Sequence, residues 1–153
     1  MSVLVDTNVL LRRTQPGHPH YNAAVESVIR LVAAGEPVHY TLQNVAEFWN
    51  ALTRPAANNG LGLSVGRAEA EVAKIEETLT LLPDVPAMYA EWRRLVTQHG
   101  VLGAKVHDAR LVAAMNVHGV TRLLTFNAGD FARYGVEVLQ PASILGPSWS
   151  TGS

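Results

Sequence analysis

Four of the thirteen acidic residues stand apart from the others because their surroundings in the sequence are apolar. Asp6 and Asp130 each follow a short apolar run with β-strand character. Glu47 lies beside two aromatic residues in a helical pattern, and Asp108 opens a helical segment rich in alanine, leucine and valine. A buried carboxylate is costly unless it is paired, hydrogen-bonded or bound to a metal. These four residues are therefore the candidates for a functional site.

Carboxylates that gather in one place repel one another, and a bound divalent cation removes that repulsion. A ligand set made only of oxygen atoms suits a hard ion such as Mg²⁺ or Mn²⁺ and not a structural Zn²⁺ site. One or two such ions can activate a water and stabilise an in-line displacement at a phosphodiester. Neutral Thr7, Asn8 and Asn127 could orient the acids or the metal-bound waters. The residue types favour metal-dependent phosphodiester hydrolysis.

Each acid also has a purely structural interpretation. The polar run that starts at Asp6 could cap a helix, and Asp108 in a first helical turn could complement the helix dipole. Asp130 could be a turn residue, and Glu47 could pair with Arg54. Taken singly, these interpretations rank above catalysis. The joint placement of the four acids is what favours a site.

The elements that must position these residues alternate along the chain. Short apolar runs predict strands at residues 2–5, 37–40, 79–82, 122–126 and 136–139. Helical periodicity and capping residues predict helices at residues 20–34, 42–53, 65–78, 86–99 and 106–118. This alternation predicts an α/β layer fold with a mostly parallel sheet. The acids would then converge at the carboxyl edge of that sheet, where ligands bind in such folds.

The composition limits the other possibilities. With 153 residues, 48% hydrophobic and 16% charged, the chain is expected to form one globular domain over residues 1–143, followed by a flexible tail at 144–153. The absence of cysteine excludes disulfides and thiolate metal sites and fits a cytoplasmic protein. Neither a signal peptide nor a bilayer span is expected. The net charge of −1 predicts that contact with nucleic acid is local or assisted by metal ions.

Four motifs in this order resemble those of PIN domains. They are VDTNVLL at 5–11, NVAEF at 44–48, HDARLVAA at 107–114 and LLTFNAGDF at 123–131. The resemblance extends over nearly the whole chain, from residue 2 to about residue 143. The size and single-domain form are similar to those of the VapC-type toxins of bacterial toxin–antitoxin pairs.

The resemblance implies an α/β/α sandwich and Mg²⁺- or Mn²⁺-dependent endoribonuclease activity. It implies that Asp6, Glu47, Asp108 and Asp130 form the acidic constellation, with Asp6 and Asp108 as the more constant direct metal ligands. It also implies an RNA substrate, a homodimer and inhibition by an antitoxin whose C-terminal segment reaches the pocket. Asn127 departs from the pattern, since some relatives carry another acid there, and this leaves the number of metal ions open.

Four basic residues flank the acids in the sequence and could contact the phosphates of a single-stranded RNA. They are Arg12, Arg13, Lys105 and Arg110. The alternative is that they are ordinary solvated charges.

Two rival functions remain open. An aspartyl-phosphate phosphatase would use Asp6 as a covalent nucleophile. That mechanism generally needs an acid two residues later, where this chain has Asn8, and a lysine near the later acids, where only Lys74 and Lys105 are available. The other rival is a non-catalytic RNA- or protein-binding module on the same fold, because the site and not the fold determines function.

Overall fold

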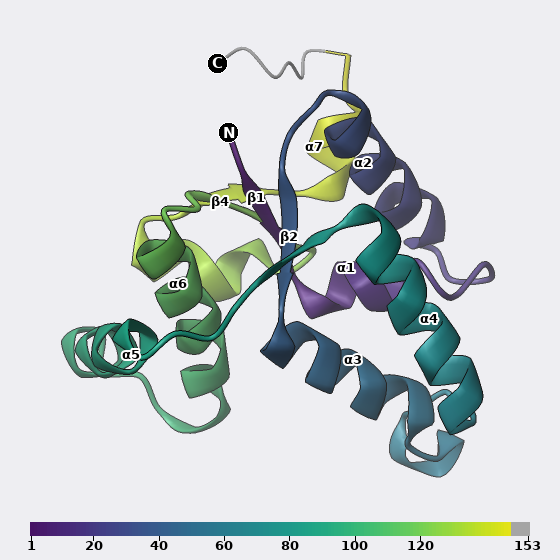
Figure 1. The fold of residues 1–153 in the computed structure, drawn as a ribbon, viewed down its shortest axis with the longest axis horizontal. Coiled ribbons are helices and arrows are strands. Elements are labelled where there is room, and N and C mark those ends of the chain that lie inside the picture. Colours follow the sequence, from purple (N-terminus) through teal and green to yellow (C-terminus); the bar gives the residue numbers. More distant parts are fainter. Residues whose placement is uncertain (148–153) are drawn as a thin grey trace.

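A computed structural model describes residues 1–147 and contains one five-stranded sheet, in which all neighbouring strands are parallel (Figure 1). The strand order is β3-β2-β1-β4-β5. The strands are β1 (Val3–Val5), β2 (Val38–Thr41), β3 (Thr80–Leu82), β4 (Arg122–Leu124) and β5 (Glu137–Leu139).

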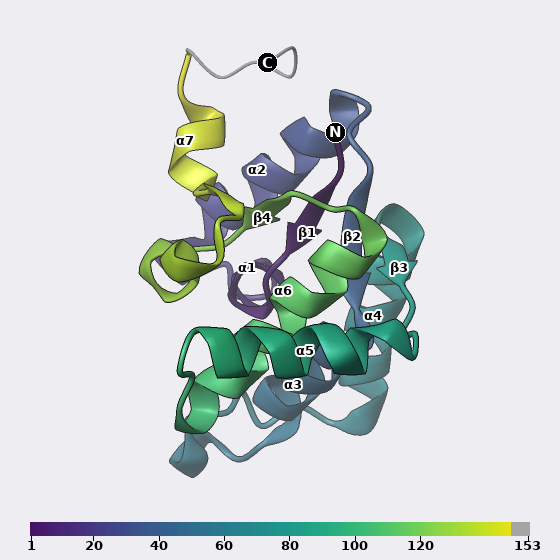
Figure 2. The same cartoon turned by 90° about the vertical axis from the view of Figure 1, so that its left-hand side faces the viewer.

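Helices cover both faces of this sheet, so the predicted α/β/α sandwich is confirmed. The α-helices are α1 (Thr7–Arg12), α2 (Tyr21–Ala33), α3 (Leu42–Thr53), α4 (Val65–Thr78), α5 (Ala87–Gln98), α6 (Val106–His118) and α7 (Pro141–Leu145). Short 3-10 helices are η1 (Ala56–Asn58), η2 (Gly103–Lys105) and η3 (Ala128–Tyr134). Helices α5 and α6 form one layer, which lies in front of the sheet in Figure 2.

Strand β1 lies at the centre of the sheet and is buried on both faces. Val3 and Val5 pack into the cluster formed with helices α1 to α4 and α7, whereas Leu4 packs into the cluster formed with α5 and α6. All three side chains are fully buried. A strand apolar at every position is therefore what this place in a parallel sheet requires.

Helix α3 begins directly after β2 with a reciprocal capping box. The backbone N–H of Asn44 donates to the Thr41 hydroxyl at 3.1 Å, and the backbone N–H of Thr41 donates to the Asn44 side-chain oxygen at 2.9 Å. Two backbone donors at the helix start are thereby satisfied. This fixes where α3 leaves the carboxyl edge of the sheet.

Residues 144 and 145, which the sequence places at the start of a flexible tail, are helical. Helix α7 continues to Leu145, and Ile144 is fully buried in the cluster that contains Val28 and Leu31 of α2. Arg30 donates to the carbonyls of Ile144 and Leu145 at 3.3 and 3.4 Å. Ile144 and Leu145 therefore belong to the described fold, because Ile144 packs against α2, and the domain boundary at residue 143 stays a prediction. The rest of the predicted tail, residues 148–153, lies outside the described residues.

Among residues 1–147, no helix combines the length and the apolar character that crossing a bilayer requires.

Candidate active site

The four predicted acids line a single cleft of about 330 Å³ at the carboxyl edge of the sheet. Asp6 follows β1, Glu47 lies on α3, Asp108 lies in the first turn of α6, and Asp130 lies on η3 after β4. The convergence expected from a parallel sheet is thus observed. Three predicted neutral neighbours and four further residues complete the wall: Thr7, Asn8, Asn127, Leu11, Asn50, Ala51 and Arg54.

Asp6 is the most buried acid of the cleft, and both of its carboxylate oxygens are hydrogen-bonded. The backbone N–H of Thr7 donates to Oδ1 at 2.8 Å, and the Thr125 hydroxyl donates to Oδ2 at 2.8 Å. Burial raises the pKa of Asp6 from 3.8 to about 6, against these two hydrogen bonds, and the charges of Asp108 and Glu47 raise it further. A carboxyl with such a perturbed pKa, in a cleft with other acids, is a candidate functional group.

A lysine lies beside the cleft, between two of its acids. Lys105 Nζ lies 2.7 Å from Asp130 Oδ1 and 3.9 Å from Asp108 Oδ2. Burial and the nearby Asp130 raise the pKa of Asp108, and Lys105 partly offsets this. The hydrogen bond to Asp130 raises the pKa of Lys105 itself, so this side chain is a cation at neutral pH.

Thr125 connects Asp6 to two uncharged residues of the site through hydrogen bonds. It was not predicted from the sequence to be a site residue. It is fully buried just after β4, and its hydroxyl accepts hydrogen bonds from Asn8 Nδ2 at 3.2 Å and from the backbone N–H of Asn127 at 3.0 Å. The same hydroxyl donates to Asp6. Its position in the sequence could have identified it, because Thr125, like Asp6, follows an apolar run.

Asn44 is a second buried polar residue that sequence reasoning missed as part of the site. Its side-chain amide donates to the Thr7 hydroxyl at 3.1 Å, while its oxygen caps α3 through Thr41. Asn44 therefore connects α3 to α1, and so fixes the helix of Glu47 relative to Asp6. A Thr-x-x-Asn sequence at a strand–helix junction was the available signal.

None of the four basic residues predicted to contact phosphate lines the acid cleft. Arg12 donates to Gln15 at 2.7 Å, and Arg13 lies in a separate hollow between α2 and α4, beside Glu71. Lys105 pairs with the acids, as described above. Arg54 lines the cleft instead, and its buried Nε atom has no hydrogen-bond partner among the described residues.

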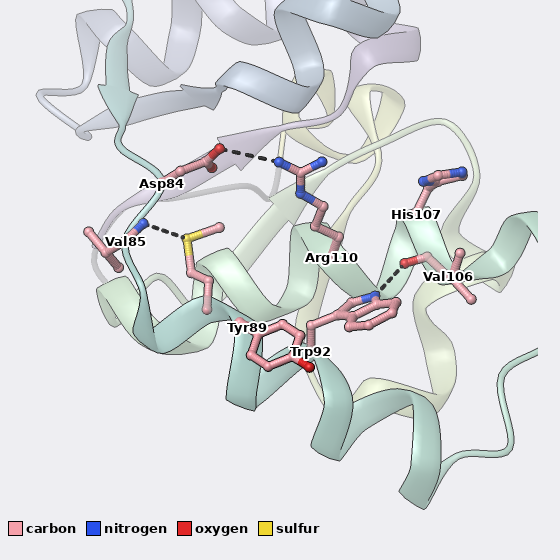
Figure 3. A pocket seen from close by; sticks show the side chains of 8 residues that line it. Asp84, Val85, Tyr89, Trp92, Val106, His107 and Arg110 are labelled. Carbon is pink, nitrogen blue, oxygen red and sulfur yellow. Dashed lines mark hydrogen bonds and ion pairs between the residues drawn. The ribbon is translucent and has the colours of Figure 1, made fainter.

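Arg110 faces a different hollow of about 400 Å³, between α5 and α6, where it pairs with Asp84 at 3.2 Å (Figure 3). The same hollow contains Trp92, whose indole N–H donates to the Val106 carbonyl at 2.9 Å. His107 also lines this hollow, although it is adjacent in sequence to Asp108. The start of α6 therefore contributes to two separate surfaces.

The donor set of the cleft fits a hard divalent cation. Carboxylate and amide oxygens are the ligands such ions prefer, and burial, with a further contribution from the neighbouring acids, raises the pKa values of Asp6 and Asp108. Within residues 1–147, however, no three acidic or histidine side chains are close enough to form a ready-made cage.

The fold and the cleft together define an α/β/α protein with a carboxylate-lined pocket at the end of a parallel sheet. A family model for the PIN domain matches residues 3–137. The chain belongs to the PIN domain family. Sequence comparison with curated proteins gives no match.

Solved structures share the fold over nearly the whole chain. VapBC2 from Rickettsia felis, bound to a promoter DNA fragment, has a TM-score of 0.69 at 12% identity and covers 92% of this chain and 98% of its own. VapC20 from Mycobacterium tuberculosis, described as a sarcin–ricin loop cleaving toxin, has a TM-score of 0.64 at 21% identity, with coverages of 90% and 98%. FitAB bound to the IR36 DNA fragment has a TM-score of 0.61 at 26% identity, with coverages of 91% and 94%.

Proposed function

We propose that this protein is a metal-dependent endoribonuclease that hydrolyses RNA phosphodiester bonds. The observation that carries the proposal is the convergence of four carboxylates, from four separate elements, on one cleft. Asp6 and Asp108 are the proposed principal ligands of Mg²⁺ or Mn²⁺, and Glu47 and Asp130 complete the catalytic set. A bound divalent ion supplies charge stabilisation at the phosphodiester and an activated water.

Neighbouring polar residues position the groups that would carry out this chemistry. Thr7 and Thr125 fix the orientation of the Asp6 carboxylate through two hydrogen bonds. Asn8 and Asn127 donate hydrogen bonds to Thr125 and line the acid cleft, where they can orient water molecules. The charged acids can accept a proton from a water positioned between them.

RNA is the proposed substrate because VapC20, which shares the fold, is described as cleaving the sarcin–ricin loop. With a net charge of −1, the chain has little general attraction for phosphate, so binding depends on the metal and on local cations. Arg54 is the best-placed of these, since it lies in the cleft wall. This residue replaces Arg12, Arg13 and Arg110 as our candidate for phosphate contact.

We also propose that the protein is the toxin of a toxin–antitoxin pair, that it is cytoplasmic and that it forms a homodimer. The support is that the structural neighbours include toxin–antitoxin assemblies, among them a complex from Klebsiella pneumoniae. Light scattering of the purified chain would test the dimer. Co-expression with the product of an adjacent gene would test the antitoxin.

The deciding experiment is cleavage of a mixed cellular RNA by protein freed of any partner, in Mg²⁺, in Mn²⁺ and in EDTA, with Asp6→Asn in parallel. Metal-dependent cleavage by the wild type alone supports the proposal. Equal cleavage by both proteins contradicts it. Metal-independent RNA binding without cleavage favours the binding module, and release of phosphate from monoesters favours the phosphatase.

A further inference from the structure

The negative charge on one side of the acid cleft is partly compensated by a lysine of the chain itself. The sequence contains two lysines, and only one lies at the cleft. Lys105 contacts Asp130 at 2.7 Å and lies 3.9 Å from Asp108, whereas Lys74 pairs with Glu71 on the surface of α4 at 3.2 Å. The Lys105 ammonium is therefore the resident cation between two of the four acids.

We propose that Lys105 is an exchangeable counter-ion, which occupies the space between Asp108 and Asp130 in the metal-free protein and leaves when a divalent cation binds. This inference rests on the proposed function, because it concerns the same carboxylates. Its consequence is that Lys105 lowers the affinity of the cleft for metal. The lysine thereby sets the cation concentration at which the site fills.

The location of Lys105 allows such an exchange. Its side chain is 48% exposed and ends the short helix η2, which follows the 82% exposed Leu102. A lysine has a flexible stem and three rotatable donors, so its ammonium can move without changing the backbone. Ion pairs at this level of exposure are weak, and a doubly charged ion between two carboxylates can displace a single charge.

A buried ion pair elsewhere in the protein differs from the exposed pair of Lys105 and Asp130. Arg122 and Glu36 lie 2.9 Å apart and are only 3% and 5% exposed, and Glu36 also binds the N-terminal amine of Met1. Removing either partner there would leave an uncompensated buried charge. Lys105 has no such constraint, because Asp130 is 36% exposed and can be solvated once the lysine leaves.

The ion pair occupies two of the four acids, and no ready-made cage is present among residues 1–147. With Lys105 in place, Asp130 turns its Oδ1 to the ammonium, and Asp108 receives partial compensation from the same charge. The positive charge of Arg133 also acts on Lys105 and lowers its pKa, while Arg133 itself donates to the His99 carbonyl at 3.1 Å. No second basic side chain of the described chain pairs with Asp130.

Mn²⁺ binding, measured by the loss of the free-ion signal in electron paramagnetic resonance, tests this proposal. We expect Lys105→Gln to bind Mn²⁺ roughly fivefold more tightly than the wild type, as for the loss of an exposed ion pair. Lys105→Arg should keep the lower affinity because it keeps the charge. Lys74→Gln is the matched control and should be unchanged.

Wild-type or weaker affinity in Lys105→Gln would overturn the inference while leaving the proposed metal site intact. If neither the wild type nor Lys105→Gln binds Mn²⁺ at millimolar concentration, the proposed function fails as well. Asp6→Asn serves as the control for Mn²⁺ that binds outside the site. A direct readout is available, because lysine labelled at Cε gives one methylene signal for each of the two lysines. Mg²⁺ should shift the Lys105 signal in step with binding and leave the Lys74 signal in place. A Lys105 signal that does not respond to bound Mg²⁺ would also overturn the inference.

Discussion

The Thr125 hydroxyl donates to a carboxylate oxygen of Asp6 at 2.8 Å, although 119 positions separate the two residues in the chain. The bond joins the ends of two neighbouring strands, β1 and β4. It opposes the effect of burial, which raises the pKa of Asp6 to about 6. Thr125 therefore keeps the central acid of the cleft closer to its charged form.

Replacing Thr125 by valine should destabilise the protein and weaken its metal binding. The substitution keeps the shape but leaves the backbone N–H of Asn127 and the Asn8 amide without their acceptor, at a cost of roughly 1–3 kcal/mol in the free energy of unfolding. Thr125→Ser keeps the hydroxyl and serves as the control. Urea unfolding and Mn²⁺ titration of both variants measure the effect. Wild-type stability and Mn²⁺ affinity in Thr125→Val would show that the hydroxyl is dispensable.

Asp108→Asn should abolish RNA cleavage and leave the fold intact. Loss of one group that stabilises transition-state charge typically lowers the rate by about 100-fold or more. Asp84→Asn is the matched control, because Asp84 pairs with Arg110 in the separate hollow between α5 and α6. The rate is measured on a fixed RNA in saturating Mg²⁺, and circular dichroism checks the fold. Wild-type cleavage by Asp108→Asn would remove this residue from the proposed catalytic set.

Asp6 should make the metal-free protein less stable as the pH rises. Its carboxyl loses its proton at a pH of about 6 in the folded state and at about 3.8 in the unfolded chain. Between these values the folded state binds more protons, so the free energy of unfolding falls with rising pH and stays lower above pH 6. The cost of ionising the folded protein reaches roughly 2–3 kcal/mol.

The variant Asp6→Asn lacks this titration, so its stability relative to wild type should improve from pH 4 to about pH 6. The net gain at pH 7 should be about 1–2 kcal/mol, because the amide cannot accept the Thr125 hydrogen bond as the carboxylate does. Urea unfolding in EDTA across this range measures the difference. A difference that is constant with pH would show that Asp6 titrates normally in the folded protein.

Binding of Mg²⁺ or Mn²⁺ should raise the melting temperature. A ligand at 100 times its dissociation constant stabilises the folded state by about 2.7 kcal/mol, which corresponds to roughly 5–10 °C for a chain of this size. Asp6→Asn should blunt the rise, whereas Glu71→Gln, which alters a carboxylate paired with Lys74 outside the cleft, should keep it. Differential scanning fluorimetry measures the melting temperature of each protein with and without the metal ion. Equal rises in all three proteins would argue against a metal site that contains Asp6.

The fold was predictable because local signals and tertiary contacts agree in most elements. The predicted runs match the five strands to within one or two residues, and the capping residues Thr41 and Ser64 mark where α3 and α4 begin. The gathering of the acids followed from the parallel sheet alone, because strand ends meet at one edge. The catalytic and metal-binding roles of these acids remain predictions.

What the sequence did not reveal depends on contacts between distant segments. Thr125 and Asn44 are ordinary polar residues until the fold brings them to Asp6 and Thr7. The ion pair of Lys105 with Asp130 spans 25 positions, so sequence proximity to Asp108 alone could not identify it. In the same way, α7 is a short segment without strong periodicity, and it becomes a helix because Ile144 packs against α2.

The central position of β1 has a consequence for synthesis of the protein. Strand β1 leaves the ribosome before both of its neighbours, and it can pair with β2 long before β4, which begins at Arg122, has been made. At translation rates of about 5–20 residues per second, that delay lasts many seconds. During this interval the nascent chain carries Asp6 without Thr125 or Asp130, so it cannot yet have a complete cleft. Any activity of the site can therefore begin only after the chain has been made as far as Asp130.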